Sequence, residues 1–190
     1  MIDRNLAIEK TLKHVGPNDM LLSTTGMISR EVFVTDDRPG NFYMLGSMGL
    51  LSSFGLGLAL MVPEQRVIIL EGDGSAMMSL GNLPLIASAG PLNLIHVILD
   101  NEAYESTGGQ PSISSGFDLA RIGLDSGYSS SVRVDEIEEL EPELLRCTEK
   151  PGPHLLVIKC SIAPISGIPR VSHTPTEIRD RFKAHIRSKI

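Results

Sequence analysis

An aspartate and an asparagine stand where two strands are predicted to end. Asp73 lies between two glycines in the segment EGDGS, directly after the apolar run RVIIL. Asn101 follows a second apolar run, LNLIHVILD, which ends at Asp100. Carboxylate and amide oxygens, together with a diphosphate and a water, can complete the octahedral shell of Mg²⁺. These residue types therefore indicate a site for Mg²⁺ and a diphosphate, provided that the fold brings the two strand ends together.

Two buried parallel strands would place both residues at one edge of a sheet. Residues 66–70 and 92–100 are short apolar β-type runs, and residues 75–90 between them are typical of a helix despite Gly81 and Pro84. Ligands of α/β folds bind at the carboxyl ends of the strands, where glycines and a helix start favour phosphate. The GDG segment alone is equally compatible with an ordinary strand–turn–helix unit. The asparagine after the second strand favours the ligand site.

The sequence around these residues resembles that of a known protein family. GDGS, followed by a helix, a strand and DN, is similar to the Mg²⁺–thiamine diphosphate signature of thiamine-dependent decarboxylases. DRPGNFYMLGSMGL and LDNEAYESTGGQ resemble the cofactor domain of phosphonopyruvate decarboxylases and of sulfopyruvate decarboxylase β subunits. The resemblance covers most of the chain, from about Asp19 to the C-terminal helix. It implies the thiamine-diphosphate-binding fold, a three-layer α/β/α domain with a mostly parallel central sheet.

The resemblance also implies which residues hold the cofactor. Asp73, Asn101 and the carbonyl of Ala103 would be the protein ligands of Mg²⁺. Further contacts to thiamine diphosphate would come from Thr25, Gly26, Gly46, Ser47, Met48, Gly72, Gly74, Ser75 and Tyr104. Candidates for lining the substrate pocket are Glu102, Tyr104, Ser106, Thr107 and Gln110.

Several of these positions have two interpretations. A methionine beside glycines, such as Met48, usually fills a gap in a core. The resemblance instead implies that Met48 wedges beneath the cofactor and holds it bent, while the Gly46 carbonyl accepts a hydrogen bond from the aminopyrimidine. A hydroxyl such as that of Thr25, at a strand end, can donate to phosphate or cap the next helix. The segment GLGLAL lacks the third glycine of a dinucleotide-binding motif and falls within a predicted helix, which argues against that function.

The remaining periodicity predicts alternating helices and strands. Helices are expected over 1–14, from about residue 27 to Val34, and over 52–62, 117–127, 135–150 and 175–189. Strands are expected over 20–24, 41–45, 128–134 and 154–161. Thr174, Pro175 and Glu177 fit a capping box with proline at the first helical position. Residues 102–116 are expected to form a long functional loop, and residues 166–175 an irregular segment crossing the active-site edge.

The composition is that of a globular protein. The 190 residues are 42% hydrophobic and 21% charged, and residues 1–190 are expected to form a single domain. The net charge of −6 argues against nucleic acid or an anionic membrane as a partner. No signal peptide, membrane-spanning run or disulfide framework is evident, so cytoplasmic residence is expected. Histidine spacing predicts no zinc site, and His96, inside an apolar run, is expected to be a satisfied core residue.

The resemblance implies a β-type subunit of a Mg²⁺- and thiamine-diphosphate-dependent 2-keto acid decarboxylase, converting sulfopyruvate to sulfoacetaldehyde and CO₂. Such enzymes need a glutamate at the pyrimidine N1′, which belongs to a pyrimidine-binding domain that this chain is expected to be too short to contain. The glutamates here are expected in helices and in the loop after Asn101, where none fits that role. A partner α subunit is therefore expected to supply it, in a hetero-oligomer in which copies of this domain also self-associate.

Other functions stay open at this point. Phosphonopyruvate could replace sulfopyruvate as the small anionic substrate, and Arg30, Arg38 and Arg170 are candidates for binding the charged tail. The same half-site could serve carboligation. A non-catalytic module that binds diphosphates or nucleotides would keep GDG but would have no use for GSMG together with DN.

Overall fold

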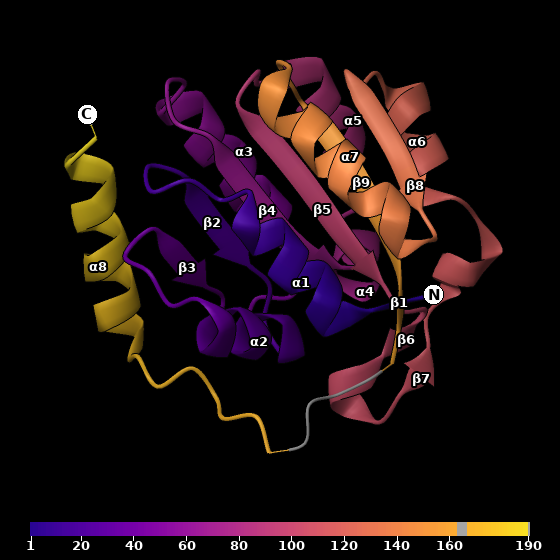
Figure 1. Ribbon diagram of the computed structural model, residues 1–190, viewed down its shortest axis with the longest axis horizontal. Helices are drawn as coiled ribbons and strands as arrows, with labels where there is room; N and C mark the ends of the chain where they lie inside the picture. The colour runs from indigo at the N-terminus through magenta and orange to yellow at the C-terminus, as the bar shows by residue number, and fades with distance from the viewer. Residues whose placement is uncertain (163–166, 190) are drawn as a thin grey trace.

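Strands and helices alternate along the chain in the computed structural model, which describes residues 1–162 and 167–189 (Figure 1). The strands are β1 (Ile2–Asp3), β2 (Met20–Ser23), β3 (Asn41–Tyr43), β4 (Val67–Gly72), β5 (Leu94–Asp100), β6 (Ala103–Tyr104), β7 (Gln110–Pro111), β8 (Ser130–Val134) and β9 (His154–Ser161). The helices are α1 (Arg4–Lys13), α2 (Met27–Thr35), α3 (Leu51–Met61), α4 (Asp73–Met78), α5 (Asn82–Ala89), α6 (Leu119–Ser126), α7 (Ile137–Glu149) and α8 (Pro175–Arg187), with single 3₁₀ turns η1 (Glu105–Thr107) and η2 (Ile113–Gly116).

Seven of the strands form one sheet, in the order β1-β9-β5-β4-β2-β3, with β8 also paired to β9. All pairs in this sheet are parallel. Parallel neighbours need crossover connections, and the helices that make them cover both faces of the sheet (Figure 1). The predicted three-layer α/β/α architecture is therefore confirmed.

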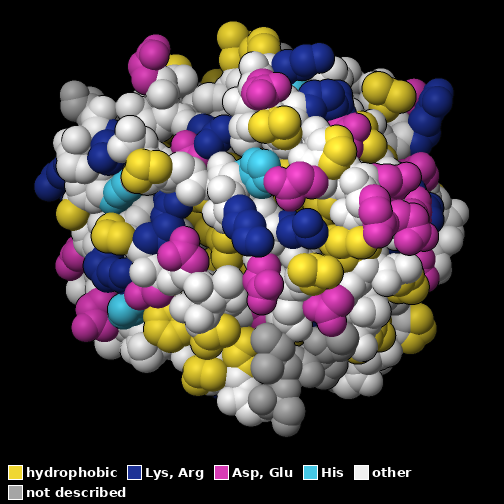
Figure 2. Space-filling model, in the orientation of Figure 1, with side chains coloured by type: hydrophobic (Ala, Val, Ile, Leu, Met, Phe, Trp, Pro, Cys, Tyr) yellow, Lys and Arg dark blue, Asp and Glu magenta, His cyan; other side chains and the backbone are white. Residues whose placement is uncertain are grey.

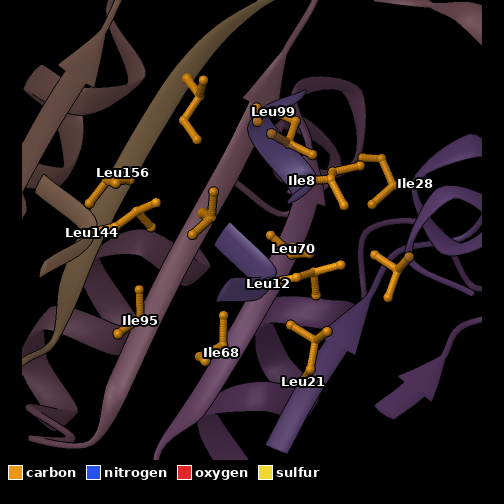
Figure 3. Packing of buried hydrophobic residues seen from close by; sticks show 14 of the residues in the cluster. Ile8, Leu12, Leu21, Ile28, Ile68, Leu70, Ile95, Leu99, Leu144 and Leu156 are labelled. Carbon is orange, nitrogen blue, oxygen red and sulfur yellow. The ribbon is translucent and has the colours of Figure 1, made fainter. Parts of the chain in front are cut away.

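Each face of the sheet has its own apolar core. Side chains alternate along β4, so that Ile68 and Leu70 face α1, α2 and α7 while Ile69 packs under α3 and α5. Figure 3 shows Ile8 and Leu12 of α1 lying over the first of these faces. Both faces are buried, which explains why the central strands read as continuous apolar runs rather than as alternating ones. This rigid sheet fixes the positions of the strand ends.

The predicted helix over residues 1–14 begins later than expected. Ile2 and Asp3 form the short strand β1 beside β9. Asp3 has extended backbone angles and its carboxylate accepts a hydrogen bond from the Leu6 N–H at 3.1 Å, which makes it the N-cap of α1. The helix therefore starts at Arg4, close to the carboxyl edge of the sheet.

The predicted helix over residues 75–90 is two helices, α4 and α5, separated between Met78 and Asn82. Pro84 would remove a hydrogen bond from the middle of one continuous helix. Because a new helix begins at Asn82, Pro84 falls in its first turn, where no intrahelical partner is needed. The first of the two helices begins at Asp73 itself rather than at Ser75.

Residues 102–116 are more ordered than the predicted loop. The strands β6 and β7 pair antiparallel, and the turns η1 and η2 flank the second of them. Gly108 and Gly109 have φ values of 122° and 74°, so the reversal between the two strands depends on residues without a side chain. The segment folds back over the carboxyl ends of the main strands.

The other predicted elements lie within a few residues of their expected positions. The capping box of α8 is confirmed, with Thr174 accepting from the Glu177 N–H at 3.2 Å. Figure 2 shows side chains of both charges spread over the face that α1 and α7 cover. Of the irregular segment 166–175, residue 166 lies outside the described residues, and 167–173 runs below α2 in Figure 1. No helix in the described part of the chain is both long and apolar enough to cross a membrane.

Candidate functional site

The ends of β2, β4 and β5 open into one cavity at the carboxyl edge of the sheet. The register pairs Gly72 with Leu99, so Asp73 and Asn101 leave neighbouring strands at nearly the same level. Nine predicted cofactor contacts line this cavity: Thr25, Met48, Gly72, Asp73, Gly74, Ser75, Asn101, Ala103 and Tyr104. Ser106 and Thr107, two of the predicted substrate contacts, line it as well.

The other three predicted contacts are not among the residues that line this cavity. Gly46 and Ser47 border a separate hollow beside Phe42 and α8. Gly26 is not among the cavity-lining residues, although a side chain there would come within 3.7 Å of the Ser106 hydroxyl. The structure thus brings the GDG segment and the Asn101 loop together, and places part of the GSMG segment to one side of them.

Asp73 is a buried carboxylate, with 2% of its surface exposed. Its Oδ2 atom accepts hydrogen bonds from the hydroxyls of Ser112 and Ser114, the second at 3.1 Å. Burial, followed by the nearby Asp100 carboxylate, raises the pKa of Asp73 despite these hydrogen bonds. Asp73 forms no ion pair with any described residue, whereas Asp100 is neutralised by Lys159 at 2.8 Å. A cation bound in the cavity would remove the cost of this uncompensated charge.

Asn101 is held at both ends of its side-chain amide. Its Oδ1 accepts from the Ala103 N–H at 3.1 Å, and its Nδ2 donates to Glu105 Oε2 at 3.2 Å. Glu102, between Asn101 and Ala103, has a φ of 58°, a left-handed conformation that is uncommon for glutamate. The side chain of this strained residue is fixed by an ion pair, with 2.5 Å between Glu102 Oε1 and Lys159 Nζ. The turn carries the backbone of Ala103 back over the cavity.

Met48 and Tyr104 close over Gly74. A Cβ atom at Gly74 would lie 2.5 Å from Tyr104 Cε1 and 3.1 Å from Met48 Cε, so any larger residue there would displace the Tyr104 ring. Met48 is 37% exposed and lines the cavity, which contradicts the alternative in which it fills the core. Ser47, with a φ of 55°, forms part of the turn that presents Met48.

Ser75 lines the cavity, and its hydroxyl is hydrogen-bonded to three groups of the protein. Its hydroxyl donates to Glu71 Oε1 at 2.7 Å and accepts from the Gly49 N–H at 3.0 Å. The hydroxyl of Thr24 also donates to it, at 3.3 Å. These hydrogen bonds tie the GSMG segment to α4, and the contact of Ser75 with the cofactor stays a prediction.

The expectation that every glutamate lies in a helix or in the Asn101 loop was wrong. Glu71 lies in β4, is fully buried, and faces His96 Nε2 at 3.0 Å. His96 is a satisfied core residue, as predicted. Its partner was missed because Glu71 was assigned to the GDG turn, whereas β4 continues to Gly72.

Arg4 is the arginine that lines the cavity, and sequence reasoning missed it. Its partners are Glu31 and Glu105, which are 27 and 101 residues away, so no local pattern reveals the cluster. The predicted candidate Arg38 donates to the carbonyls of Val15 and Asp19, before β2 begins, and so lies at the opposite edge of the sheet. Arg30 and Arg170 do not line the cavity either.

A parallel α/β domain with carboxylate, amide and hydroxyl groups around a cavity at its strand ends is typical of proteins that bind phosphorylated cofactors. Residues 24–158 match the family model of the thiamine pyrophosphate enzyme C-terminal TPP-binding domain. The chain belongs to this family. The resemblance predicted from GDGS and DN is thereby confirmed.

Known relatives agree with this assignment. The chain is 38% identical to the sulfopyruvate decarboxylase subunit beta of Methanococcus maripaludis over 175 residues, 92% of this chain and 93% of that protein. It is 36% identical over 183 residues to the phosphonopyruvate decarboxylase of Streptomyces viridochromogenes, covering 96% of this chain and 46% of that protein, so it spans less than half of that relative. The fold superimposes on benzoylformate decarboxylase from Polynucleobacter necessarius with a TM-score of 0.72 and 20% identity, over 84% of this chain and 33% of that one.

Proposed function

We propose that the chain is the cofactor-binding, β-type subunit of a decarboxylase that depends on thiamine diphosphate and Mg²⁺. The proposed reaction converts sulfopyruvate to sulfoacetaldehyde and CO₂. The observation that carries the proposal is the uncompensated, buried carboxylate of Asp73 beside Asn101 and Ala103. The near full-length similarity to a sulfopyruvate decarboxylase β subunit supports the choice of reaction.

The proposed Mg²⁺ ligands are the carboxylate of Asp73, the amide oxygen of Asn101 and the carbonyl of Ala103. The described residues contain no cluster of three or more His, Cys, Asp or Glu side chains that could hold a metal, so the set relies on one carboxylate and neutral oxygens. Mg²⁺ accepts such a set when phosphate oxygens and water complete its shell. Asp73 and Asn101 also fit because both residues line the cavity and both side chains carry oxygen atoms.

Bound thiamine diphosphate would supply the carbon nucleophile and the electron acceptor that the loss of CO₂ from a 2-keto acid requires. The residues of this chain would bind and orient it. The diphosphate would lie against the GDG segment and the hydroxyl of Thr25. Met48 would support the cofactor from below, and Tyr104 and the segment 102–116 would exclude water from one side of the site.

A partner chain is part of the proposal. We infer that the glutamate needed at the pyrimidine N1′ comes from an α subunit with a pyrimidine-binding domain, because the glutamates near the cavity already have partners within this chain. Glu71 is bonded to His96 and Ser75, and both Glu31 and Glu105 pair with Arg4. Exposed apolar side chains on α3 support contacts with further chains. Phe54, Leu60 and Met61 are 38%, 54% and 79% exposed there. Self-association of this domain through that face, together with binding of the α subunit, would produce a hetero-oligomer.

Phosphonopyruvate is a second candidate substrate, favoured by the similarity to phosphonopyruvate decarboxylase over 96% of the chain. Both substrates are small anionic 2-keto acids, and the tail-binding residues would have to come partly from the partner. Cytoplasmic residence is also proposed. Cys147 and Cys160 are buried, free thiols, which suits a reducing compartment.

Reconstitution tests the proposal. The purified chain would be assayed with thiamine diphosphate and Mg²⁺, alone and with an equal amount of the α subunit, against sulfopyruvate and phosphonopyruvate separately. Negligible turnover by the chain alone and release of CO₂ from sulfopyruvate after mixing are expected. Full turnover by the chain alone, shown by mass spectrometry to be free of partner, would contradict the half-site proposal. Turnover of phosphonopyruvate only would reassign the substrate.

A further inference from the structure

A buried charge cluster stands directly behind Asn101. Arg4, at the first position of α1, donates to both oxygens of Glu31, from Nε at 2.8 Å and from Nη2 at 2.5 Å. The same guanidinium donates to both oxygens of Glu105 on the turn η1, from Nη2 at 3.2 Å and from Nη1 at short range. The Arg4 and Glu31 side chains are 4% and 1% exposed, and that of Glu105 is 11% exposed. One arginine thus joins α1, α2 and the segment 102–116.

Glu105 in turn fixes which way the Asn101 amide faces. A carboxylate can only accept a hydrogen bond, so the group 3.2 Å from Glu105 Oε2 must be the Asn101 amino group. A backbone N–H can only donate, so the group 3.1 Å from the Ala103 nitrogen must be the Asn101 carbonyl oxygen. Both contacts select the same orientation. The reversed amide would set a donor against a donor at Ala103 and an acceptor against an acceptor at Glu105.

We propose that Arg4 and Glu105 are positioning residues, which orient the Asn101 amide oxygen for metal binding and hold the segment 102–116 over the site. This inference rests on the proposed Mg²⁺ site. Glu105 can approach Asn101 because Arg4 compensates its charge beside the buried Glu31. The guanidinium already faces two carboxylates, so it acts through Glu105 rather than by binding the anionic substrate. Such residues behind a ligand typically change metal affinity by about 10- to 100-fold.

Charge and positioning make opposite predictions for Arg4→Met. This change removes a positive charge next to a cation site, so charge alone would strengthen Mg²⁺ binding. Positioning predicts weaker binding, because Glu105 loses its clamp. The pair Glu105→Ala and Glu105→Gln separates the two effects again. Both remove one negative charge, but only glutamine keeps an oxygen that can accept from the Asn101 amino group.

The experiment measures Mg²⁺-dependent binding of thiamine diphosphate to the purified chain by calorimetry. Arg4→Met and Glu105→Ala are expected to weaken it by about tenfold or more, and Glu105→Gln by about threefold or less. Arg66→Met is the matched control. Arg66 pairs with Asp19 at 2.5 Å at the opposite edge of the sheet, so its loss removes a comparable ion pair without touching the site. Affinity in this control is expected to be unchanged.

Hydrogen–deuterium exchange of the ligand-free chain gives a second readout. The Ser112 N–H donates to the Glu102 carbonyl at 2.8 Å, and the Gly109 N–H to the Tyr104 carbonyl at 3.0 Å. Both amides should exchange faster in Arg4→Met and Glu105→Ala, while amides of β4 should not change. If Arg4→Met does not fold, Glu105→Ala decides, because it leaves the Arg4–Glu31 pair intact.

The outcomes separate this inference from the proposed function. A wild-type chain that shows no Mg²⁺-dependent binding, either alone or mixed with the α subunit, would overturn the function, and the inference with it. Wild-type binding that is equalled or exceeded by both Arg4→Met and Glu105→Ala would overturn the inference alone. Equal losses in Glu105→Ala and Glu105→Gln would show that charge, not positioning, is responsible.

Discussion

Glu71 and His96 form a fully buried pair across the neighbouring strands β4 and β5, with 3.0 Å between Glu71 Oε2 and His96 Nε2. The other Glu71 oxygen accepts a hydrogen bond from the Ser75 hydroxyl, and this hydroxyl accepts one from the Gly49 N–H. Hydrogen bonds therefore run without a break from the interior of the sheet to the residue that follows Met48. The pair links the stability of the core to the position of the loop that carries Met48.

Removing one member of this pair should destabilise the fold strongly. Glu71→Ala is expected to lower the free energy of unfolding by about 3–5 kcal/mol, because His96 loses its partner in the core. The double variant Glu71→Leu with His96→Leu should recover much of this loss, since a buried pair can be replaced by apolar residues. Urea unfolding followed by circular dichroism measures both.

The control for that prediction is Glu141→Ala. Glu141 pairs with His14 at 2.8 Å, but its side chain is 52% exposed. Solvent screens exposed pairs, so Glu141→Ala should change the free energy of unfolding far less than Glu71→Ala. A Glu71→Ala variant no less stable than Glu141→Ala would show that the buried pair does not support the fold.

Met48→Ala should impair the cofactor's reactivity more than its binding. Met48 lines the cavity at the edge of Gly74, and its loss would remove support beneath the bent cofactor. Exchange of the thiazolium C2 proton in the reconstituted enzyme, followed by NMR, is expected to slow by about 10- to 100-fold. Leu145→Ala, at an exposed position of α7, is the control and should leave exchange unchanged. An unaltered rate in Met48→Ala would remove Met48 from the active site.

The attachment of α8 should weaken in acid. Partial burial acts to raise the pKa of Asp37, but hydrogen bonds from His173, Arg181 and Tyr43 outweigh it and lower that pKa below its ordinary value of 3.8. A carboxyl group with a lowered pKa stabilises the fold above its unfolded-state pKa, and this contribution is lost as the pH falls through the folded-state value. Asp37→Asn should therefore be less stable than wild type at pH 6, by roughly 1 kcal/mol or less.

The difference between wild type and Asp37→Asn should shrink as the pH falls below about 4. Urea unfolding at several pH values measures it, with Asp125→Asn as a control from an exposed pair on α6. A difference that stays constant down to pH 3 would mean that the Asp37 charge is not responsible.

Sequence reasoning identified the parts of the site that are local in the chain. Asp73 and Asn101 each directly follow an apolar strand, so their chemistry and their shared edge follow from adjacent residues. The break before α5 could also have been predicted from the sequence, because Pro84 is better suited to a first helical turn than to a helix interior. Local signals of this kind explain why most of the elements were predicted correctly.

Contacts between distant parts of the chain could not be predicted in this way. Arg4 reaches Glu105 across 101 residues, and neither has a spacing pattern that suggests the other. Glu71 and His96 become neighbours only through the register of β4 and β5. Part of the GSMG segment turns away from the cavity because Ser47 and Gly49 adopt left-handed conformations, which the sequence did not reveal.

The most direct test of the account is a calorimetric titration of the purified chain with thiamine diphosphate, with and without Mg²⁺. Binding is expected with Mg²⁺, and its loss with a chelator. Asp73→Ala should abolish the Mg²⁺-dependent part while circular dichroism shows an intact fold, because the buried carboxylate is the one charged metal ligand proposed. Affinity in Asp73→Ala equal to that of wild type would contradict the central claim that Asp73 holds the metal and, through it, the cofactor.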